Sequence, residues 1–147
     1  MAEGVWTLQF DDMLLPGPNQ LMRMHAQRYR MLRDELRMIG MAKLTPKAPP
    51  EPIERCRVEV DMWRPKRNLL DADAKFGAVK PLLDVLQPDR TYTRKMGTRS
   101  LPDVTPGLGL IRDDRDGEGD LTGCITTLTV RQHLGAARVD VTVTALS

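Results

Sequence analysis

Two aspartates placed two residues apart, Asp71 and Asp73, are the first candidates for chemistry in this sequence. In an extended segment such residues point to the same side, and their carboxylates repel each other unless a cation lies between them. Hard oxygen ligands of this kind favour Mg²⁺ or Mn²⁺ over zinc. Asp113 and Asp114 offer a third carboxylate from a distant part of the chain. Three carboxylates and water would make a magnesium site that activates water for in-line attack on a phosphate.

The aspartate pair also has a purely structural interpretation. Asp73 is a good N-cap for a helix that begins after it, and Asp71 would then be solvated. Basic residues on both sides of the pair favour the chemical interpretation, because cations beside carboxylates are typical of a site that takes an anionic substrate. These basic residues are Arg64, Lys66 and Arg67 before the pair and Lys80 after it.

Basic residues gather in two further places, although the net charge of the 147-residue chain is only +2. The helical spacing of Arg23, Arg30, Arg33 and Arg37 fits either a phosphate-binding face or a solvated one. Basic residues exceed acidic ones over residues 21–68, and acidic residues exceed basic ones over residues 101–147. Such a separation is typical of an enzyme that binds phosphates and holds metal ions, and ordinary surface charge gives the same pattern. The second place, residues 90–99, has no acidic residue and carries Arg90, Arg94, Lys95 and Arg99.

Hydrophobic spacing predicts the elements that position these residues. Residues 5–10 are typical of a first strand, and residues 20–41 are typical of a helix with one apolar stripe. A second helix begins near Asp73 and is kinked or restarts near Lys80, because the ring of Pro81 fits best in a first turn. Residues 53–63 alternate, which predicts a half-buried strand whose inner side carries Cys56, Val58, Val60 and Met62.

The second half of the chain predicts a loop and several strands. Residues 87–107 are basic and contain several prolines, and we predict an irregular loop that is functional or mobile. Residues 109–111 predict a short strand that leads into the acidic pair. Residues 124–132 and 138–145 alternate by twos and predict a terminal hairpin. This order of elements predicts a single α+β domain over residues 1–147, with a mixed sheet packed against two helices.

Three motifs, taken in order along the chain, resemble the RusA family of Holliday-junction resolvases. Residues 80–86 (KPLLDVL), which follow residues 71–73 (DAD), resemble the core motif of that family. Residues 109–114 (GLIRDD) resemble its second acidic motif, and residues 16–19 (PGPN) resemble the turn after its first strand. The order of elements matches over nearly the whole chain.

The resemblance implies a crossover-junction endodeoxyribonuclease, which resolves four-way DNA junctions by symmetric paired nicks in recombination, repair or phage DNA processing. It implies that Asp71, Asp73 and Asp114 are catalytic and bind Mg²⁺, with Mn²⁺ as a substitute. Lys80 would be the essential lysine near the scissile phosphate. The partners implied are branched DNA and a second copy of the chain in a homodimer. Backbone phosphates would be bound by Arg64, Lys66, Arg67, Arg90, Arg94, Lys95 and Arg99.

The sequence departs from the family pattern in three places. Ala74 stands where the family has an asparagine, and three extra residues lie between Asp73 and Lys80. Lys75 is therefore a rival for the role of Lys80, and Asp113 is a rival for that of Asp114. The longer segment 87–107 indicates an altered DNA-contacting loop. Two alternative functions stay open: a related nuclease that acts on flaps or other branches, and a non-catalytic protein that binds branched DNA.

Length and composition exclude several other classes of protein. The chain has the length of one domain, and no stretch is apolar for long enough to span a membrane. The N-terminal residues have no signal-peptide pattern, so we expect a cytoplasmic protein of a bacterium or a phage-infected host, with no membrane partner. Neither cysteine belongs to a Cys-x-x-Cys pair, which argues against a zinc ribbon. His25 and His133 lack a ligand-spaced partner, and we predict structural or surface roles for them.

Overall fold

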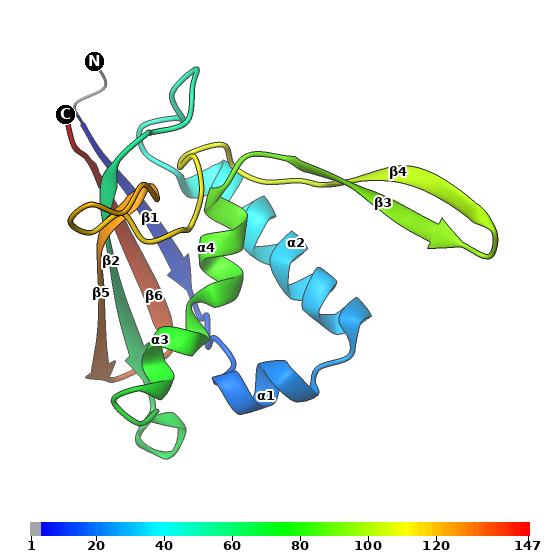
Figure 1. Cartoon of the computed structure of the whole chain (residues 1–147). Helices are drawn as coiled ribbons and strands as arrows, with labels where there is room; N and C mark the ends of the chain where they lie inside the picture. Colours follow the sequence, from blue (N-terminus) through cyan, green and yellow to red (C-terminus); the bar gives the residue numbers. More distant parts are fainter. Residues whose placement is uncertain (1–3) are drawn as a thin grey trace.

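Four strands form a mixed sheet in which the strand that begins at Cys56 has a neighbour on each side (Figure 1). The structure is a computed structural model that describes residues 4–147. The expectation of no signal peptide concerns the N-terminal residues, of which residues 1–3 lie outside the described part. The sheet order is β1–β6–β2–β5. β2 runs antiparallel to β6 and parallel to β5, and β6 runs antiparallel to β1. The strands are β1 (Val5–Asp11), β2 (Cys56–Arg64), β5 (Ile125–Leu134) and β6 (Arg138–Ala145).

The alternation seen in the sequence places the core on one face of this sheet. The four inward residues predicted for β2 are all fully buried, and so are alternate valines of β6. Helices α2 (Ala26–Lys43) and α4 (Lys80–Leu86) pack on that face, where Leu36, Leu82 and Leu86 are fully buried. The prediction of an α+β domain with a mixed sheet and two main helices is confirmed.

The helices are divided more than the apolar spacing predicted. The expected helix at 20–41 consists of α1 (Pro18–Arg23) and α2, because His25 starts a new helix by accepting the amide N–H of Gln27 on Nδ1. The second helical stretch begins with a 3₁₀ turn, η1 (Lys66–Asn68), and continues as α3 (Ala74–Ala78) and α4. Pro81 lies in the first turn of α4, so the predicted restart near Lys80 is confirmed.

The predicted terminal hairpin is wrong in its pairing, although both of its strands exist. β5 and β6 do not pair with each other, because β2 lies between them and pairs with both. Two interstrand spacings amount to about 10 Å, which the three residues 135–137 can span. The amide of Gly135 donates to the carbonyl of Arg64 as the loop crosses the end of β2. Alternation identifies strands, but it does not identify their partners.

The segment expected to be an irregular loop is a second, two-stranded sheet that projects from the body of the protein (Figure 1). β3 (Arg90–Met96) pairs antiparallel with β4 (Arg99–Thr105), and Gly97 has a φ of 63°, which suits a tight hairpin turn. Nearly every residue of this arm is exposed, so it lacks the apolar alternation by which buried strands are recognised. The short strand expected at 109–111 is reduced to one bridge between Ile53 and Ile111.

The two cysteines lie close together in the core as free thiols. Cys56 and Cys124 are buried, and their Sγ atoms lie 3.7 Å apart, where β2 meets the segment before β5. Residues that are far apart in the sequence therefore meet at this end of the sheet. Within residues 4–147, no helix has both the length and the apolar character needed to cross a membrane.

Arg64 ends β2 as a buried arginine, with a relative exposure of 4%. Its Nε donates to the carbonyl of Asn68 at 2.7 Å, and its Nη1 donates to the carbonyl of Leu15 at 2.6 Å. Burial lowers the pKa of this guanidinium. The expectation that Arg64 binds phosphates is therefore corrected: its side chain joins the loop after β1 to the turn that leads toward Asp71.

We predict that Arg64→Met lowers the free energy of unfolding by about 2–4 kcal/mol, because a buried carbonyl of Leu15 and a partly buried carbonyl of Asn68 lose their charged donor. Arg57→Met is the matched control, since Arg57 lies on the same strand and is exposed. Urea unfolding of both variants measures the difference. An equal loss in the two variants would contradict the structural role of Arg64.

Candidate active site

Lys80 lies between two aspartates from different segments. Its Nζ is 3.0 Å from Oδ1 of Asp84, one turn later in α4, and 2.5 Å from Oδ2 of Asp114. Asp114 follows the bridge at Ile111 and is 34 residues away in sequence. The structure thus brings together two of the residues predicted for one site.

Tyr29 of α2 completes this cluster from the other main helix. Its hydroxyl donates to Oδ2 of Asp84 at 2.9 Å, so both oxygens of Asp84 have partners. The side chain of Asp84 is only 9% exposed. Burial, followed by the hydrogen bond and the charge of Asp84, raises the pKa of Tyr29, which keeps the phenol protonated as a donor. Asp84 is therefore a fixed anchor for Lys80.

The electrostatics of the cluster keep Lys80 charged. Burial alone would lower the pKa of Lys80, but its hydrogen bonds to Asp114 and Asp84 and their negative charges raise it above the ordinary value. The side chain is still 56% exposed. An ammonium group has three donors, and the two aspartates account for two of them. Lys80 can therefore present a charged N–H to an anion that arrives from solvent.

Asp113 and Asp114 are both partly buried, but their side chains have different partners. Oδ1 of Asp113 accepts the backbone amides of Arg115 and Cys124, and its Oδ2 accepts from the side chain of Arg115. Burial alone would raise the pKa of Asp113, but these amides and the nearby arginines lower it. Asp113 holds the turn, whereas Asp114 faces Lys80 and lines a cleft of about 350 Å³ with Leu83 and residues 125–128.

Asp71 and Asp73 are exposed in the turn that precedes α3. Asp73 occupies the N-cap position with helical dihedral angles and makes no side-chain cap hydrogen bond, so the capping interpretation is not realised. The turn is anchored just before Asp71 by the carboxamide of Gln132 on β5. Its Oε1 accepts the amide of Leu70 at 2.7 Å, and its Nε2 donates to the carbonyl of Leu70 at 2.9 Å.

The three carboxylates predicted as metal ligands, Asp71, Asp73 and Asp114, are not gathered at one point of the described structure. Among residues 4–147, no three His, Cys, Asp or Glu side chains are grouped so that they could hold a metal ion. Asp71 and Asp73 are not gathered with Asp114, which instead directs Oδ2 to Lys80. In this arrangement Asp114 is paired with Lys80, whereas Asp71 and Asp73 lie in the separate turn before α3.

Lys80, and not its rival Lys75, makes the contact with Asp114. The ammonium of Lys75 lies 5.5 Å from the ring centroid of Phe76 on α3, in a cation–π position. α3 and α4 are separated at Val79, which is the C-cap residue of α3 and the N-cap residue of α4. Lys80 is therefore the first residue of α4.

The predicted phosphate-binding residues lie on two exposed surfaces, apart from Arg64. Lys66 and Arg67 are exposed on η1. At the base of the β3–β4 arm, Arg30 and Arg33 of α2 line a cleft of about 270 Å³ together with Tyr92 of the arm. Asp34 and Asp103 line the same cleft, and Arg94 lies 3.8 Å from Asp103, so both basic and acidic residues lie where α2 meets the arm. The exposed basic residues of the arm are Arg90, Arg94, Lys95 and Arg99.

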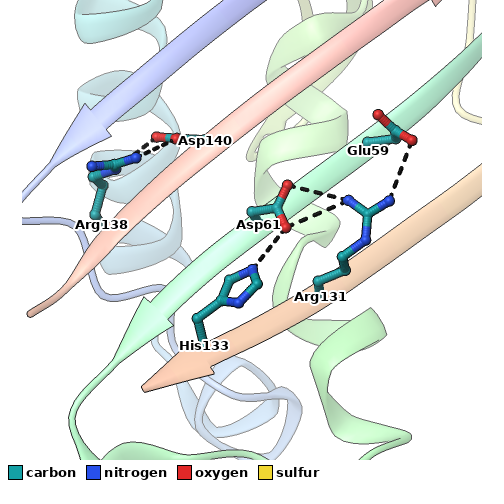
Figure 2. Close-up of polar contacts among 6 residues, drawn as sticks. All are labelled: Glu59, Asp61, Arg131, His133, Arg138 and Asp140. Atoms are coloured by element: carbon teal, nitrogen blue, oxygen red, sulfur yellow. Dashed lines mark hydrogen bonds and ion pairs between the residues drawn. The ribbon is translucent and has the colours of Figure 1, made fainter. Parts of the chain in front are cut away.

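The sheet face turned away from the helices carries charges that pair with one another (Figure 2). Asp61 accepts from Arg131 and lies 2.8 Å from Nε2 of His133. Arg131 also reaches Glu59, and Arg138 pairs with Asp140 at 2.7 Å. Trp63 lies between His133, at 4.7 Å between ring centroids, and Arg138, at 4.3 Å. The charged residues of this face are therefore paired with one another, and the contact of His133 with Asp61 agrees with a structural role for His133.

Three contributors to the site carried little signal in the sequence. Asp84 lies four residues after Lys80, the spacing at which helical side chains pair, so it could have been found from the motif. Tyr29 has the spacing of the apolar stripe predicted for residues 20–41, and Gln132 ends the stretch predicted as a strand at 124–132. Their roles depend on long-range contacts that spacing does not reveal.

Comparisons of the chain with protein-family profiles, with curated proteins and with solved structures give no match. The resemblance to the RusA family therefore rests on the motif residues and their order alone. The contact between Lys80 and Asp114 is a property of this fold that stands independently of that resemblance.

We predict that Gln132→Leu removes both hydrogen bonds to Leu70, lowers the free energy of unfolding by about 1–2 kcal/mol and loosens the acidic turn. Hydrogen exchange of the Leu70 amide measures the local effect, and urea unfolding measures the global one. Gln9→Leu is the control, because Gln9 is exposed on β1 and bonds only to Asp11. Unchanged protection of the Leu70 amide would contradict the anchoring role.

Proposed function

We propose that this protein is a structure-selective endodeoxyribonuclease that resolves four-way DNA junctions by symmetric paired nicks. The observation that carries the proposal is the contact between Lys80 and Asp114, which joins the two motifs that resemble the RusA family. The cluster is open to solvent at Lys80, and exposed basic residues on η1 and on the arm are available to a polyanion. These features favour phosphodiester chemistry on DNA over a small-molecule reaction.

In the proposed reaction, a water molecule attacks the scissile phosphorus, the bond from phosphorus to one ester oxygen breaks, and that oxygen leaves as the hydroxyl end of the nicked strand. Lys80 binds the phosphate and stabilises the negative charge that grows on it during this attack. Asp84 and Tyr29 fix the position of the ammonium group, so little reorganisation is needed when the phosphate arrives. The basic arm and η1 bind backbone phosphates, which position the DNA by its shape rather than by its base sequence.

The metal requirement is part of the proposal and rests on the resemblance. Mg²⁺, with Mn²⁺ as a substitute, is the metal proposed for the reaction, and Asp71, Asp73 and Asp114 are its proposed ligands. Because these residues do not form one group in the structure, the requirement is decided by adding Mg²⁺ or EDTA in the assay. A junction has two-fold symmetry, so a homodimer would supply one site to each of the two opposed strands.

A second function, that of a non-catalytic protein binding branched DNA, is favoured by one observation. The charge of Lys80 is already paired with two aspartates, and no three acidic residues within residues 4–147 are grouped for a metal. Such a protein would keep the basic arm and bind junctions without nicking them. A related nuclease that acts on flaps would use the same site and differ only in its substrate.

We predict that an end-labelled four-way junction is nicked in Mg²⁺ and not in EDTA. Asp114→Asn and Lys80→Ala should each slow nicking by about 100-fold or more, since the first removes a proposed metal ligand and the second removes the cation proposed to stabilise the transferring phosphate. Asp120→Asn, in the exposed turn that follows, is the matched control and should nick at the unmodified rate.

Three results of this assay would contradict the proposal in different ways. Tight binding without nicks in Mg²⁺ or Mn²⁺ would support the non-catalytic protein. Faster cleavage of a matched flap than of the junction would support the flap nuclease. Nicking that survives both Asp114→Asn and Lys80→Ala would place the active site elsewhere.

The arm makes a separate prediction about affinity. The double variant Arg94→Glu/Lys95→Glu should weaken junction binding and reduce the slope of log K against log salt, by about 0.9 for each phosphate that the arm no longer neutralises. Arg57→Glu, on the opposite face of the sheet, is the control: it reverses one charge away from the arm, whereas the arm variant reverses two. Fluorescence anisotropy at several salt concentrations measures both quantities, and an unchanged slope in the arm variant would contradict a role in phosphate binding.

A further inference from the structure

Helix α2 has an outer face that nothing in the described chain covers. Met31 and Met38 are 62% and 69% exposed on this face, although methionine is an apolar residue. Arg28 and Glu35 are exposed between and beside them, so the four residues follow steps of three and four along the helix. We call Arg28, Met31, Glu35 and Met38 the outer stripe.

The outer stripe borders an open groove between α1 and α2 with a volume of about 630 Å³. Met24, Arg28, Met31 and Glu35 line this groove together with Leu32. The part of α2 that carries Arg30 and Arg33 faces the arm instead, so the groove and the arm occupy different sides of the helix. Apolar surface left open beside polar residues is typical of a protein interaction site.

The two charges of the outer stripe have no partner within residues 4–147. Neither Arg28 nor Glu35 takes part in an ion pair or a side-chain hydrogen bond there. They are seven residues apart, two turns along the helix, whereas charges on a helix surface pair at three or four residues. Both side chains are therefore free to pair with charges of another molecule.

We propose that the outer stripe is the interface of a homodimer in which two α2 helices pack antiparallel. A two-fold axis that passes near Met31 places Arg28 of one copy opposite Glu35 of the second copy, and symmetry makes this contact twice. Met31 then meets its counterpart, and Met38 lies opposite Met24. In this antiparallel arrangement, the positive residue of each stripe therefore faces the negative residue of the other.

The same stripe argues against a parallel arrangement of the two helices. In parallel register, Arg28 would face Arg28 and Glu35 would face Glu35, and like charges across an interface are unfavourable. The role of this dimer rests on the proposed function, because a junction offers two strands to cut and a dimer offers one active site to each. Association through this face itself needs no nuclease activity.

The test is the oligomeric state of the full chain without DNA, measured by sedimentation velocity over a range of concentrations. The unmodified protein should be a dimer. Arg28→Glu and Glu35→Arg should each raise the dimer dissociation constant by about tenfold or more, because each replaces two attractive pairs by two repulsive ones. The double variant Arg28→Glu/Glu35→Arg should regain the dimer, since the pairs are restored with their signs exchanged.

A matched pair of apolar variants tests the same face. Met31→Glu should give a monomer, whereas Met41→Glu should stay dimeric. Met41 is 64% exposed on the same helix, but it is rotated by about 80° from Met31 and lies off the stripe. Circular dichroism checks that each variant is folded.

Two results would overturn the proposed interface. An unmodified protein that is monomeric at all concentrations would exclude it. A dimer that is unaffected by the single charge reversals, or that the double variant fails to restore, would show that the copies meet elsewhere. Paired nicks by a protein that dimerises through another face would leave the proposed function intact, whereas absent nicking with a confirmed interface would overturn the function alone.

Discussion

The arrangement of the candidate site depends on one ion-pair cluster, in which the ammonium of Lys80 bridges Asp84 and Asp114. Asp84 belongs to the same helix and is held by Tyr29 from α2, so the lysine is fixed relative to both main helices. Asp114 belongs to the segment that leads into the edge strand β5. Because a single charge joins these three parts of the fold, the cluster is both a structural junction and the place where the two sequence motifs meet.

The parts of the fold around this cluster are held by polar contacts that reach into the loops. Arg64 bonds to the carbonyls of Leu15 and Asn68 at the end of β2, and Gln132 bonds to both backbone groups of Leu70. These two side chains fix the connection from β2 to α3 at both of its ends. The acidic turn is consequently held near the sheet, although its aspartates do not gather with Asp114 into a metal site.

The sequence predicted those features that depend on local periodicity and missed those that depend on long-range pairing. The inward residues of β2 and the helix restart at Pro81 were predicted, because burial alternates with the strand and a proline ring fits only a first turn. The separation of β5 from β6 by β2 and the exposed arm were not, because neither leaves a distinctive pattern of apolar residues. For the site, the meeting of Lys80 with Asp114 agrees with the motif reasoning, whereas the burial of Arg64 and the contacts of Gln132 and Tyr29 could be known only from the folded chain.

Lys80, as the cation that binds the phosphate, and Asp114, as its partner and a proposed metal ligand, are proposed to form one catalytic unit. A double-mutant cycle on the single-turnover nicking rate tests this joint action most directly. If the two residues form one catalytic unit, the variant Lys80→Ala/Asp114→Asn will be about as slow as the slower single variant, because the second change removes nothing that still works. If the free-energy effects of the two changes simply add, the residues act independently and the proposed joint action is contradicted.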